Sequence, residues 1–203
     1  MSNIKYQILN VQKGFTLVES LVAISILMIA IASPMILAQK GLSTATLSKD
    51  QMIASFLVQD AIEAVKNFRD QIAVSQTSVD WLVGNGAEFF VNCICDSEDT
   101  CNFDSSSLKF CNIDTTFSTW NQNSITVGSQ TSLIPLKISY FDSKFLKYDY
   151  IGSTDSKFFR YINIKRTSNP DEALLSVRVS WNSPQGIQKI DIQNFIYNYS
   201  GNL

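Results

Sequence analysis

The hydrophobic pattern changes character along the 203 residues of the chain. From residue 15 to residue 38 nearly every side chain is apolar, and Glu19 is the one charged residue in this run. A helix rises by about 1.5 Å per residue, so a run of this length crosses the roughly 30 Å hydrocarbon core of a bilayer. Residues 1–14, which precede it, carry Lys5 and Lys13. The pattern therefore predicts a membrane-spanning helix behind a short basic leader.

Beyond residue 38 the solid apolar run becomes an amphipathic helical stripe, with charged and amide side chains on the other faces. Pro34 removes one backbone donor and predicts a kink rather than an end, since apolar residues follow it. We therefore predict one helix from about residue 15 to about residue 69, and assign residues 39–72 to its amphipathic continuation. The stripe that packs against a folded domain consists of Ile53, Leu57, Ala61, Ala64, Phe68 and Ile72.

Residues 73–203 predict a β-rich domain. Between 175 and 181 apolar residues alternate with Ser and Arg, which is typical of a half-buried strand, and the turn at 183–186 makes 175–198 a hairpin. An antiparallel sheet with one apolar face has to be covered, and the helical stripe is the obvious cover. The predicted fold class is α+β, a long amino-terminal helix packed on an antiparallel β-sheet. We expect strands at 87–94, 133–141, 158–166, 175–181 and 187–198, with one or two more inside the polar segment 95–132.

The acid in the apolar run needs an explanation. An ionised carboxylate costs roughly 3 kcal/mol at mid-depth in a membrane and less near the interface. Glu19 lies one turn inside the run, so it is either an acid tolerated at the headgroups or an acid that meets a cationic partner inside a protein assembly.

The stretch Gly14-Phe15-Thr16-Leu17-Val18-Glu19 resembles the type IV prepilin signal of pilins and pseudopilins. In that family a membrane aspartyl peptidase, the prepilin peptidase, cuts after the glycine and methylates the new terminal amine. The resemblance implies cleavage between Gly14 and Phe15, N-methylation of Phe15, and pairing of Glu19 with the terminal amine of a neighbouring subunit. A buried carboxylate without its cation would be strongly unfavourable, so such a pair would set the register between helices.

Two further stretches, residues 54–70 and the hairpin 175–198, resemble PilV-type minor pilins. The resemblance implies a type IV pilin-like fold and a minor pilin or pseudopilin, assembled into a type IV pilus or a type II secretion-like filament, at the tip or as initiator of assembly. The implied partners are other pilin or pseudopilin subunits, the prepilin peptidase, a membrane assembly platform, and the lipid bilayer before assembly.

Other interpretations of the amino terminus are a secretory signal peptide and a simple single-pass anchor. Ala30-Ile31-Ala32 offers a small-x-small cleavage site for a signal peptidase. Against this, Glu19 interrupts the apolar core, and the run continues through Leu37. A simple anchor needs neither the glycine nor the acid.

The formal charge is −2, and loss of the leader with its two lysines makes the mature chain −4, so the overall composition is not that of a polyanion-binding protein. The chain has no histidine, which excludes a histidine base and histidine metal ligands. No catalytic spacing stands out, so we expect no enzyme and no cofactor. The basic leader predicts a cytoplasmic amino terminus, an inner-membrane span and a carboxyl-terminal domain outside, later in a surface pilus or periplasmic filament.

Four cysteines lie close together: Cys93, Cys95, Cys101 and Cys111. An even number of cysteines outside the cytoplasm favours disulfides. Each disulfide that closes a loop of this size stabilises the fold by roughly 2–3 kcal/mol. Cys93 and Cys95 are too close along a strand to bridge readily, which leaves two connectivities. We favour Cys95–Cys101 nested within Cys93–Cys111. A four-thiolate zinc site is the rival, but the spacing lacks paired C-x-x-C knuckles.

Two segments have unbalanced charge. Residues 88–114 hold six acids, but lack the spacing of a calcium loop and are better explained as a solvated acidic loop. Residues 137–166 hold seven basic and three acidic residues with interleaved aromatics. Lys165 and Arg166 are therefore candidate surface contacts for an alternative function, a filament-tip adhesin or DNA-uptake pilin. The competing explanations are strand faces with charged exteriors and docking of neighbouring subunits.

Overall fold

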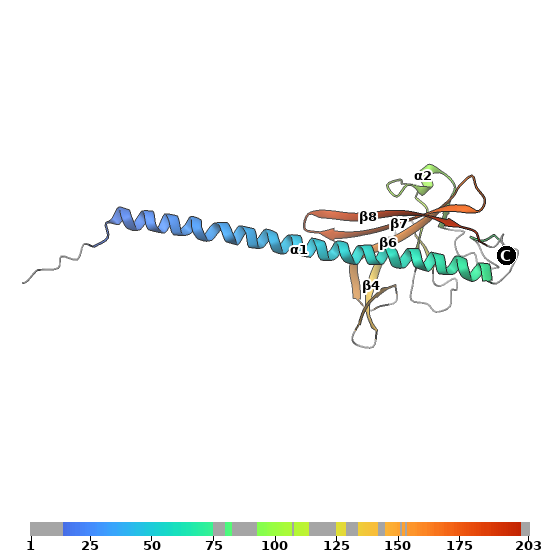
Figure 1. Cartoon of the computed structure of the whole chain (residues 1–203), viewed down its shortest axis with the longest axis horizontal. Helices are drawn as coiled ribbons and strands as arrows, with labels where there is room; N and C mark the ends of the chain where they lie inside the picture. Colours follow the sequence, from blue (N-terminus) through green and yellow to red (C-terminus); the bar gives the residue numbers. More distant parts are fainter. Residues whose placement is uncertain are drawn as a thin grey trace, which may run out of the picture. The chain divides into compact units, whose positions relative to one another are not determined.

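The computed structural model describes residues 14–74, 80–82, 93–106, 108–113, 125–128, 134–141, 145–150, 152 and 154–199. The chain separates into two compact units, residues 1–47 and 48–203. Helix α1 (Leu17–Val74) begins in the first unit and ends in the second (Figure 1). It continues through Pro34 and ends five residues beyond the position expected from the sequence.

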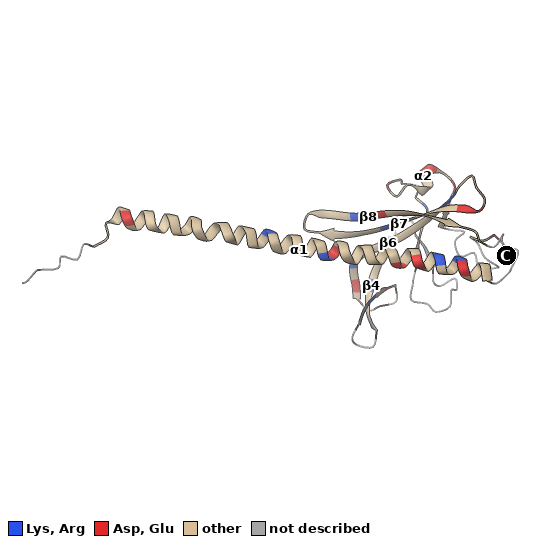
Figure 2. Ribbon diagram, in the orientation of Figure 1, with Lys and Arg blue, Asp and Glu red and all other residues tan. Residues whose placement is uncertain are grey.

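The surroundings of α1 differ between the two units. From Leu17 to Leu42 its side chains are exposed, and no residue of this part is charged between Glu19 and Lys40 (Figure 2). From Asp50 onward one face of α1 is buried. The predicted stripe lies on that face. Its buried members are Leu57, Ala61, Ala64 and Phe68, and Ile53 and Ile72 pack against the same core.

In its described residues, the second unit contains an eight-stranded sheet and one short helix besides the end of α1. The strands are β1 (Ile94–Cys95), β2 (Phe110–Ile113), β3 (Ile125–Gly128), β4 (Pro135–Phe141), β5 (Phe145–Asp149), β6 (Thr154–Arg166), β7 (Glu172–Ser183) and β8 (Gly186–Tyr197), and α2 is Glu98–Cys101. Strand β6 is central, because it pairs with β1, β2, β4 and β7. The β1–β6 pair is parallel and the other pairs are antiparallel. The α+β fold class is confirmed, and it is consistent with a type IV pilin fold.

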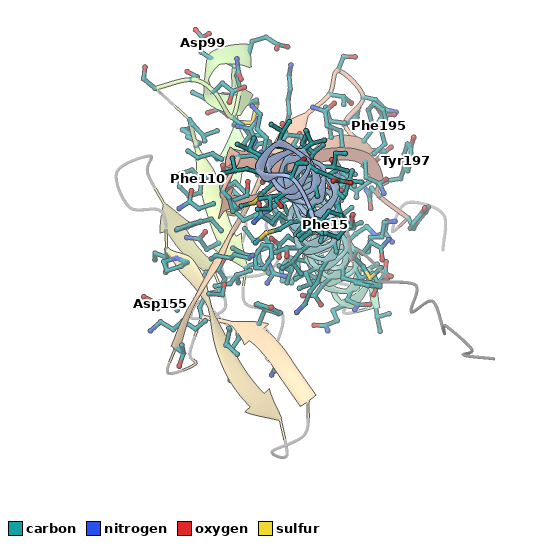
Figure 3. All side chains as sticks on the ribbon, turned by 90° about the vertical axis from the view of Figure 1, so that its left-hand side faces the viewer. Phe15, Asp99, Phe110, Asp155, Phe195 and Tyr197 are labelled. Atoms are coloured by element: carbon teal, nitrogen blue, oxygen red, sulfur yellow. A yellow bond between two sulfur atoms is a disulfide. The ribbon has the colours of Figure 1, made fainter. Side chains whose placement is uncertain are left out.

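The β7–β8 hairpin is longer than expected, running in register from Glu172 opposite Tyr197 to Ser183 opposite Gly186. Gly186 has a φ of 109°, a left-handed conformation that glycine adopts without strain and that closes the turn. Among the described strands β8 pairs with β7 alone, so it forms an edge of the sheet. Phe195 and Tyr197 lie on this strand with exposed side chains (Figure 3).

Strand β7 departs from the half-buried strand that its alternation predicts. Leu175, Val177 and Val179 join the core beneath α1, as the pattern predicts. Ser176 and Arg178, on the opposite face, are also buried, with 4% and 6% exposure. The reason is that the segment carrying α2 and the following turn lies over this face, which the alternation of β7 itself does not reveal.

Two other strands differ from the sequence-based expectation. Strand β5 pairs in register with β4, from Lys137 opposite Asp149 to Phe141 opposite Phe145, and was not predicted. Strand β6 begins at Thr154, four residues before the expected start. Strands β2 and β3 lie within 95–132, where one or two strands are expected. The strand expected at 87–94 lies outside the described residues, except for its last two positions.

The four cysteines form two disulfides, Cys93–Cys111 and Cys95–Cys101. This is the nested connectivity. Cys93 and Cys111 belong to the core beneath α1, so the outer bridge ties the residue just before β1 to β2 inside the domain. The inner bridge joins β1 to the end of α2.

A buried guanidinium joins three parts of the second unit. Arg160 of β6 has 0% exposure. Its Nη1 donates to Asp60 Oδ2 at 2.7 Å and to the carbonyl oxygen of Leu57 at 3.3 Å, both on α1. Its Nη2 donates to the carbonyl oxygen of Ile113 on β2 at 2.7 Å. Because burying a charge is costly unless it is paired and hydrogen-bonded, these contacts fix where α1 lies on the sheet.

We expect Arg160→Ala to lower the free energy of unfolding by about 3 kcal/mol, since it empties a core position and leaves buried carbonyls without a donor. Arg166→Ala is the matched control, because the Arg166 side chain is 41% exposed and pairs with Asp80 at the surface. It should cost less than about 1 kcal/mol. Chemical unfolding of the whole chain in micelles, followed by tryptophan fluorescence, measures the free energy of unfolding of both variants. Equal losses of stability in the two variants would contradict the role assigned to Arg160.

Candidate assembly site

The amino-terminal end of α1 is capped by its own sequence. Thr16 Oγ1 accepts a hydrogen bond from the backbone N–H of Glu19 at 3.2 Å, and the Thr16 carbonyl accepts from the N–H of Ser20 at 3.1 Å. Thr16 therefore acts as the N-cap, and Glu19 stands in the first turn, where the helix dipole favours a negative charge. The sequence Thr16-x-x-Glu19 is a capping signal that the sequence-based reasoning did not use.

The residues just before the helix are accessible. Gly14, Phe15 and Thr16 lie outside regular structure, and the Phe15 side chain is 81% exposed. A Cβ added at Gly14 would meet no described atom within 4 Å. Among the described residues nothing covers the Gly14 side of the peptide bond between Gly14 and Phe15, and the predicted cleavage residues lie about one turn from Glu19.

The first unit exposes a continuous apolar surface. Large side chains from Leu17 to Leu37 are more than half exposed. The hydroxyls in this part donate to the carbonyl one turn earlier, as Ser25 Oγ does to Leu21 at 2.8 Å and Ser33 Oγ to Ile29 at 3.4 Å. Their polar groups therefore need no partner from outside the helix, which suits an apolar medium.

By length and composition, α1 is the helix in the described part of the chain that is apolar enough to cross a membrane. Within that same part, no hydrogen bond or ion pair engages the Glu19 carboxylate. The first unit thus presents an apolar helical surface with one carboxylate, Glu19, near its amino-terminal end.

Within the described residues of the basic segment 137–166, several cations are engaged in ion pairs. Lys157 Nζ bonds Asp50 Oδ2 of α1 at 2.6 Å, and Arg160 is buried against Asp60. The two residues proposed as surface contacts are also paired, Lys165 with Glu98 and Arg166 with Asp80. Among the described cations of this segment, four therefore have carboxylate partners from other parts of the second unit.

The acidic cysteine segment is clamped to the sheet instead. Arg178 of β7 donates from Nη1 to Asp104 Oδ1 at 2.7 Å and from Nη2 to Asp191 Oδ2 at 2.6 Å, and its guanidinium lies 4.8 Å from the centre of the Phe103 ring. Lys189 also bonds Asp104. Hydrogen bonds from Arg178 and Lys189 lower the pKa of Asp104 to about 2. Lys165 likewise lowers the pKa of Glu98.

Sequence reasoning missed this clamp, although Arg178 was visible as the one charged residue in an alternating strand. A basic residue between buried valines is a signal that a carboxylate must approach from another segment, because a buried cation is rarely left unpaired. The acid excess of 88–114 supplies one such partner, Asp104.

Residues 9–33 match the family model described as the prokaryotic N-terminal methylation motif. The matched range contains Gly14, Phe15 and Glu19, so the geometry at the start of α1 and the motif coincide. No curated protein and no solved structure gives a significant match to the chain. The motif supports a type IV pilin-like family and a substrate of the prepilin peptidase, and proteins of that family are structural rather than enzymatic.

We expect the ion pairs of Asp104 with Arg178 and Lys189 to make the free energy of unfolding depend on pH. Because the folded-state pKa of Asp104 is depressed from 3.8 to about 2, its contribution is present above about pH 4 and is lost as the pH falls toward 2. Asp104→Asn should therefore lower stability at neutral pH and flatten the acid limb of the stability profile. Asp155→Asn, an exposed aspartate on β6, is the control. Unfolding midpoints measured between pH 2 and pH 7 test this; parallel profiles for native chain and Asp104→Asn would refute it.

Proposed function

We propose that this chain is a minor pilin or pseudopilin, a subunit trimmed by the prepilin peptidase and assembled into a type IV pilus or a type II secretion-like filament. The supporting observation is the accessible Gly14–Phe15 bond at the start of α1, with Glu19 in its first turn, inside the matched methylation motif. In this proposal residues 1–14 are the leader and 15–38 the membrane and filament-core helix. Residues 39–72 are its amphipathic continuation, and 73–203 the exported domain.

Before assembly, the apolar surface of the first unit is held in lipid. On extraction into a filament, neighbouring helices replace lipid around the same side chains, at little cost because both surroundings are apolar. The Glu19 carboxylate then pairs with the methylated terminal amine of Phe15 on a neighbouring subunit. This pair selects one stagger between adjacent helices, since any other would leave a carboxylate buried without its cation.

The basic leader favours a cytoplasmic amino terminus, and the two disulfides favour an oxidising compartment for the domain. A position at the filament tip or in initiation rests on the likeness of residues 54–70 to PilV-type minor pilins. The alternative, DNA or receptor binding through 137–166, has less support, because Lys165 and Arg166 are engaged in ion pairs within the domain.

We expect the mature chain to begin at Phe15 with a methylated amine. Intact-mass and peptide mass spectrometry of the protein purified from membranes measures this directly. Gly14→Ala is the informative variant, because it adds a side chain at the position before the cut while leaving α1 unchanged; it should accumulate with its leader attached. A mature chain that begins at Ser33, or an intact Met1 in the native protein, would refute the processing step.

We expect Glu19→Gln to enter filaments at least about tenfold less than the native chain, a loss of about 1.4 kcal/mol or more, because the amide cannot pair with a terminal ammonium. Glu63→Gln is the control, since Glu63 is exposed on the same helix within the second unit. Both variants should reach the membrane and be cleaved. Quantitative immunoblotting of sheared filaments tests the prediction, and equal incorporation of Glu19→Gln would contradict it.

A further inference from the structure

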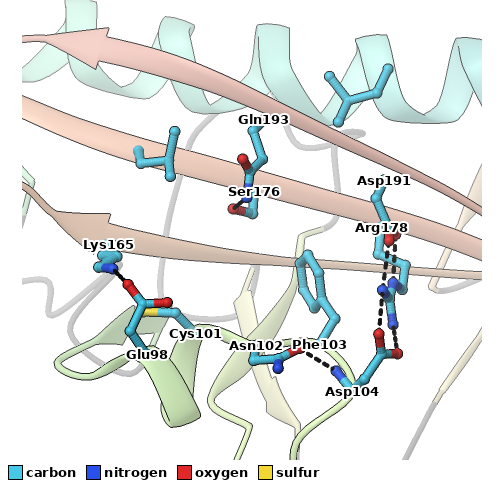
Figure 4. A pocket seen from close by; sticks show the side chains of 12 residues that line it. Glu98, Cys101, Asn102, Phe103, Asp104, Lys165, Ser176, Arg178, Asp191 and Gln193 are labelled. Atoms are coloured by element: carbon cyan, nitrogen blue, oxygen red, sulfur yellow. Dashed lines mark hydrogen bonds and ion pairs between the residues drawn. The ribbon is translucent and has the colours of Figure 1, made fainter.

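A groove of about 710 Å³ lies between the cysteine segment and the strands β6, β7 and β8. Its walls come from the inner disulfide segment, including Cys101 and Phe103, and its floor includes Ser176 of β7 and Gln193 of β8 (Figure 4). The volume falls within the roughly 300–1,000 Å³ typical of small-molecule sites. The groove belongs to the second unit and does not involve the residues assigned to assembly.

The charged groups around the groove are matched one to one. Lys165 pairs with Glu98 at one end, and Arg178 pairs with Asp104 and Asp191 at the other, where Lys189 adds the balancing positive charge. Figure 4 shows these two ion-pair clusters on either side of the Ser176–Gln193 pair. A charged ligand would have to break one of these pairs, so the electrostatics favour an uncharged occupant.

The middle of the groove offers neutral hydrogen-bonding groups. Ser176 Oγ accepts from Gln193 Nε2 at 3.4 Å, and within the described residues its hydroxyl donates to no acceptor. The Gln193 amide oxygen accepts no hydrogen bond there. Asn102 uses its amide oxygen for the N–H of Asp104 at 2.9 Å, and its amide nitrogen stays available in the same part of the chain. These groups include both donors and acceptors.

An apolar surface accompanies these polar groups. Figure 4 shows the Phe103 ring between the Ser176–Gln193 pair and Arg178, which lies over the ring at 4.8 Å. Leu174 and Ile192 add aliphatic surface to the lining. Neutral donors and acceptors beside an aromatic ring complement a sugar, which carries hydroxyls at its rim and C–H groups on its faces.

We propose that this groove binds a neutral saccharide, which hydrogen-bonds to Ser176, Gln193 and Asn102 and packs its C–H groups against the lining formed by Phe103, Leu174 and Ile192. The segment closed by the Cys95–Cys101 disulfide holds Asn102 and Phe103 in place, so the site is formed before the ligand arrives. Binding is independent of filament assembly, and its failure would leave the proposed assembly role untouched.

The test uses the full chain in phosphocholine micelles, because maltoside or glucoside detergents would compete for the groove. The probes are lactose for plain hexoses and N,N′-diacetylchitobiose for acetamido sugars, with 3′-sialyllactose as the charged comparison. We expect saturable binding of at least one neutral disaccharide with a dissociation constant of roughly 0.1–1 mM, measured by ligand-observed NMR and calorimetry. The neutral disaccharide that binds identifies the class of glycan.

Gln193→Leu should weaken binding at least about tenfold, because it removes a hydrogen-bonding group from an exposed position without disturbing the core. Ser176→Ala is a second variant with the same expectation. Gln59→Leu, an exposed glutamine on α1, is the control and should bind as the native chain does. The proposal is overturned by no saturable binding up to about 20 mM, by tighter binding of 3′-sialyllactose, or by unchanged binding in Gln193→Leu.

Discussion

One continuous helix must satisfy two different surroundings, and the rest of the molecule follows from this constraint. Up to Leu42 every side chain of α1 is exposed and most are apolar, so this part needs lipid or other helices around it. From Asp50 onward one face is buried in the domain and the other carries charge. Arg160 and Lys157 reach Asp60 and Asp50 on this second part, so ion pairs as well as apolar packing locate the helix on the sheet.

The features that the sequence predicted well are those written in local periodicity. The helix, its stripe and the β7–β8 hairpin each repeat a simple pattern over a dozen residues or more, so neighbours along the chain decide the outcome. Strand β5 is five residues long and contains a central lysine, which leaves too little alternation to recognise. The start of α1 could also be predicted from local sequence, because Gly14, Phe15 and Glu19 fall within six consecutive residues.

What the sequence could not give are contacts between distant segments. Arg178 is buried in contact with Asp104, which lies 74 positions away along the chain. Arg160 pairs with Asp60, which lies 100 positions away. Such pairings depend on how the sheet is ordered, with β6 between β2, β4 and β7. The same ordering engages Lys165 and Arg166 in surface ion pairs with Glu98 and Asp80, which the sequence alone does not reveal.

Strand β8 has twelve residues and, among the described strands, one partner, so a long row of backbone groups stays open along the sheet edge. Exposed strand edges of this length invite pairing between chains. Lys189 and Asp191 stand in the middle of this strand, and their ion pairs with Asp104 and Arg178 keep both charges fixed there. A strand that paired along this edge would lie against those charged side chains, and charged residues on an edge strand disfavour edge-to-edge pairing.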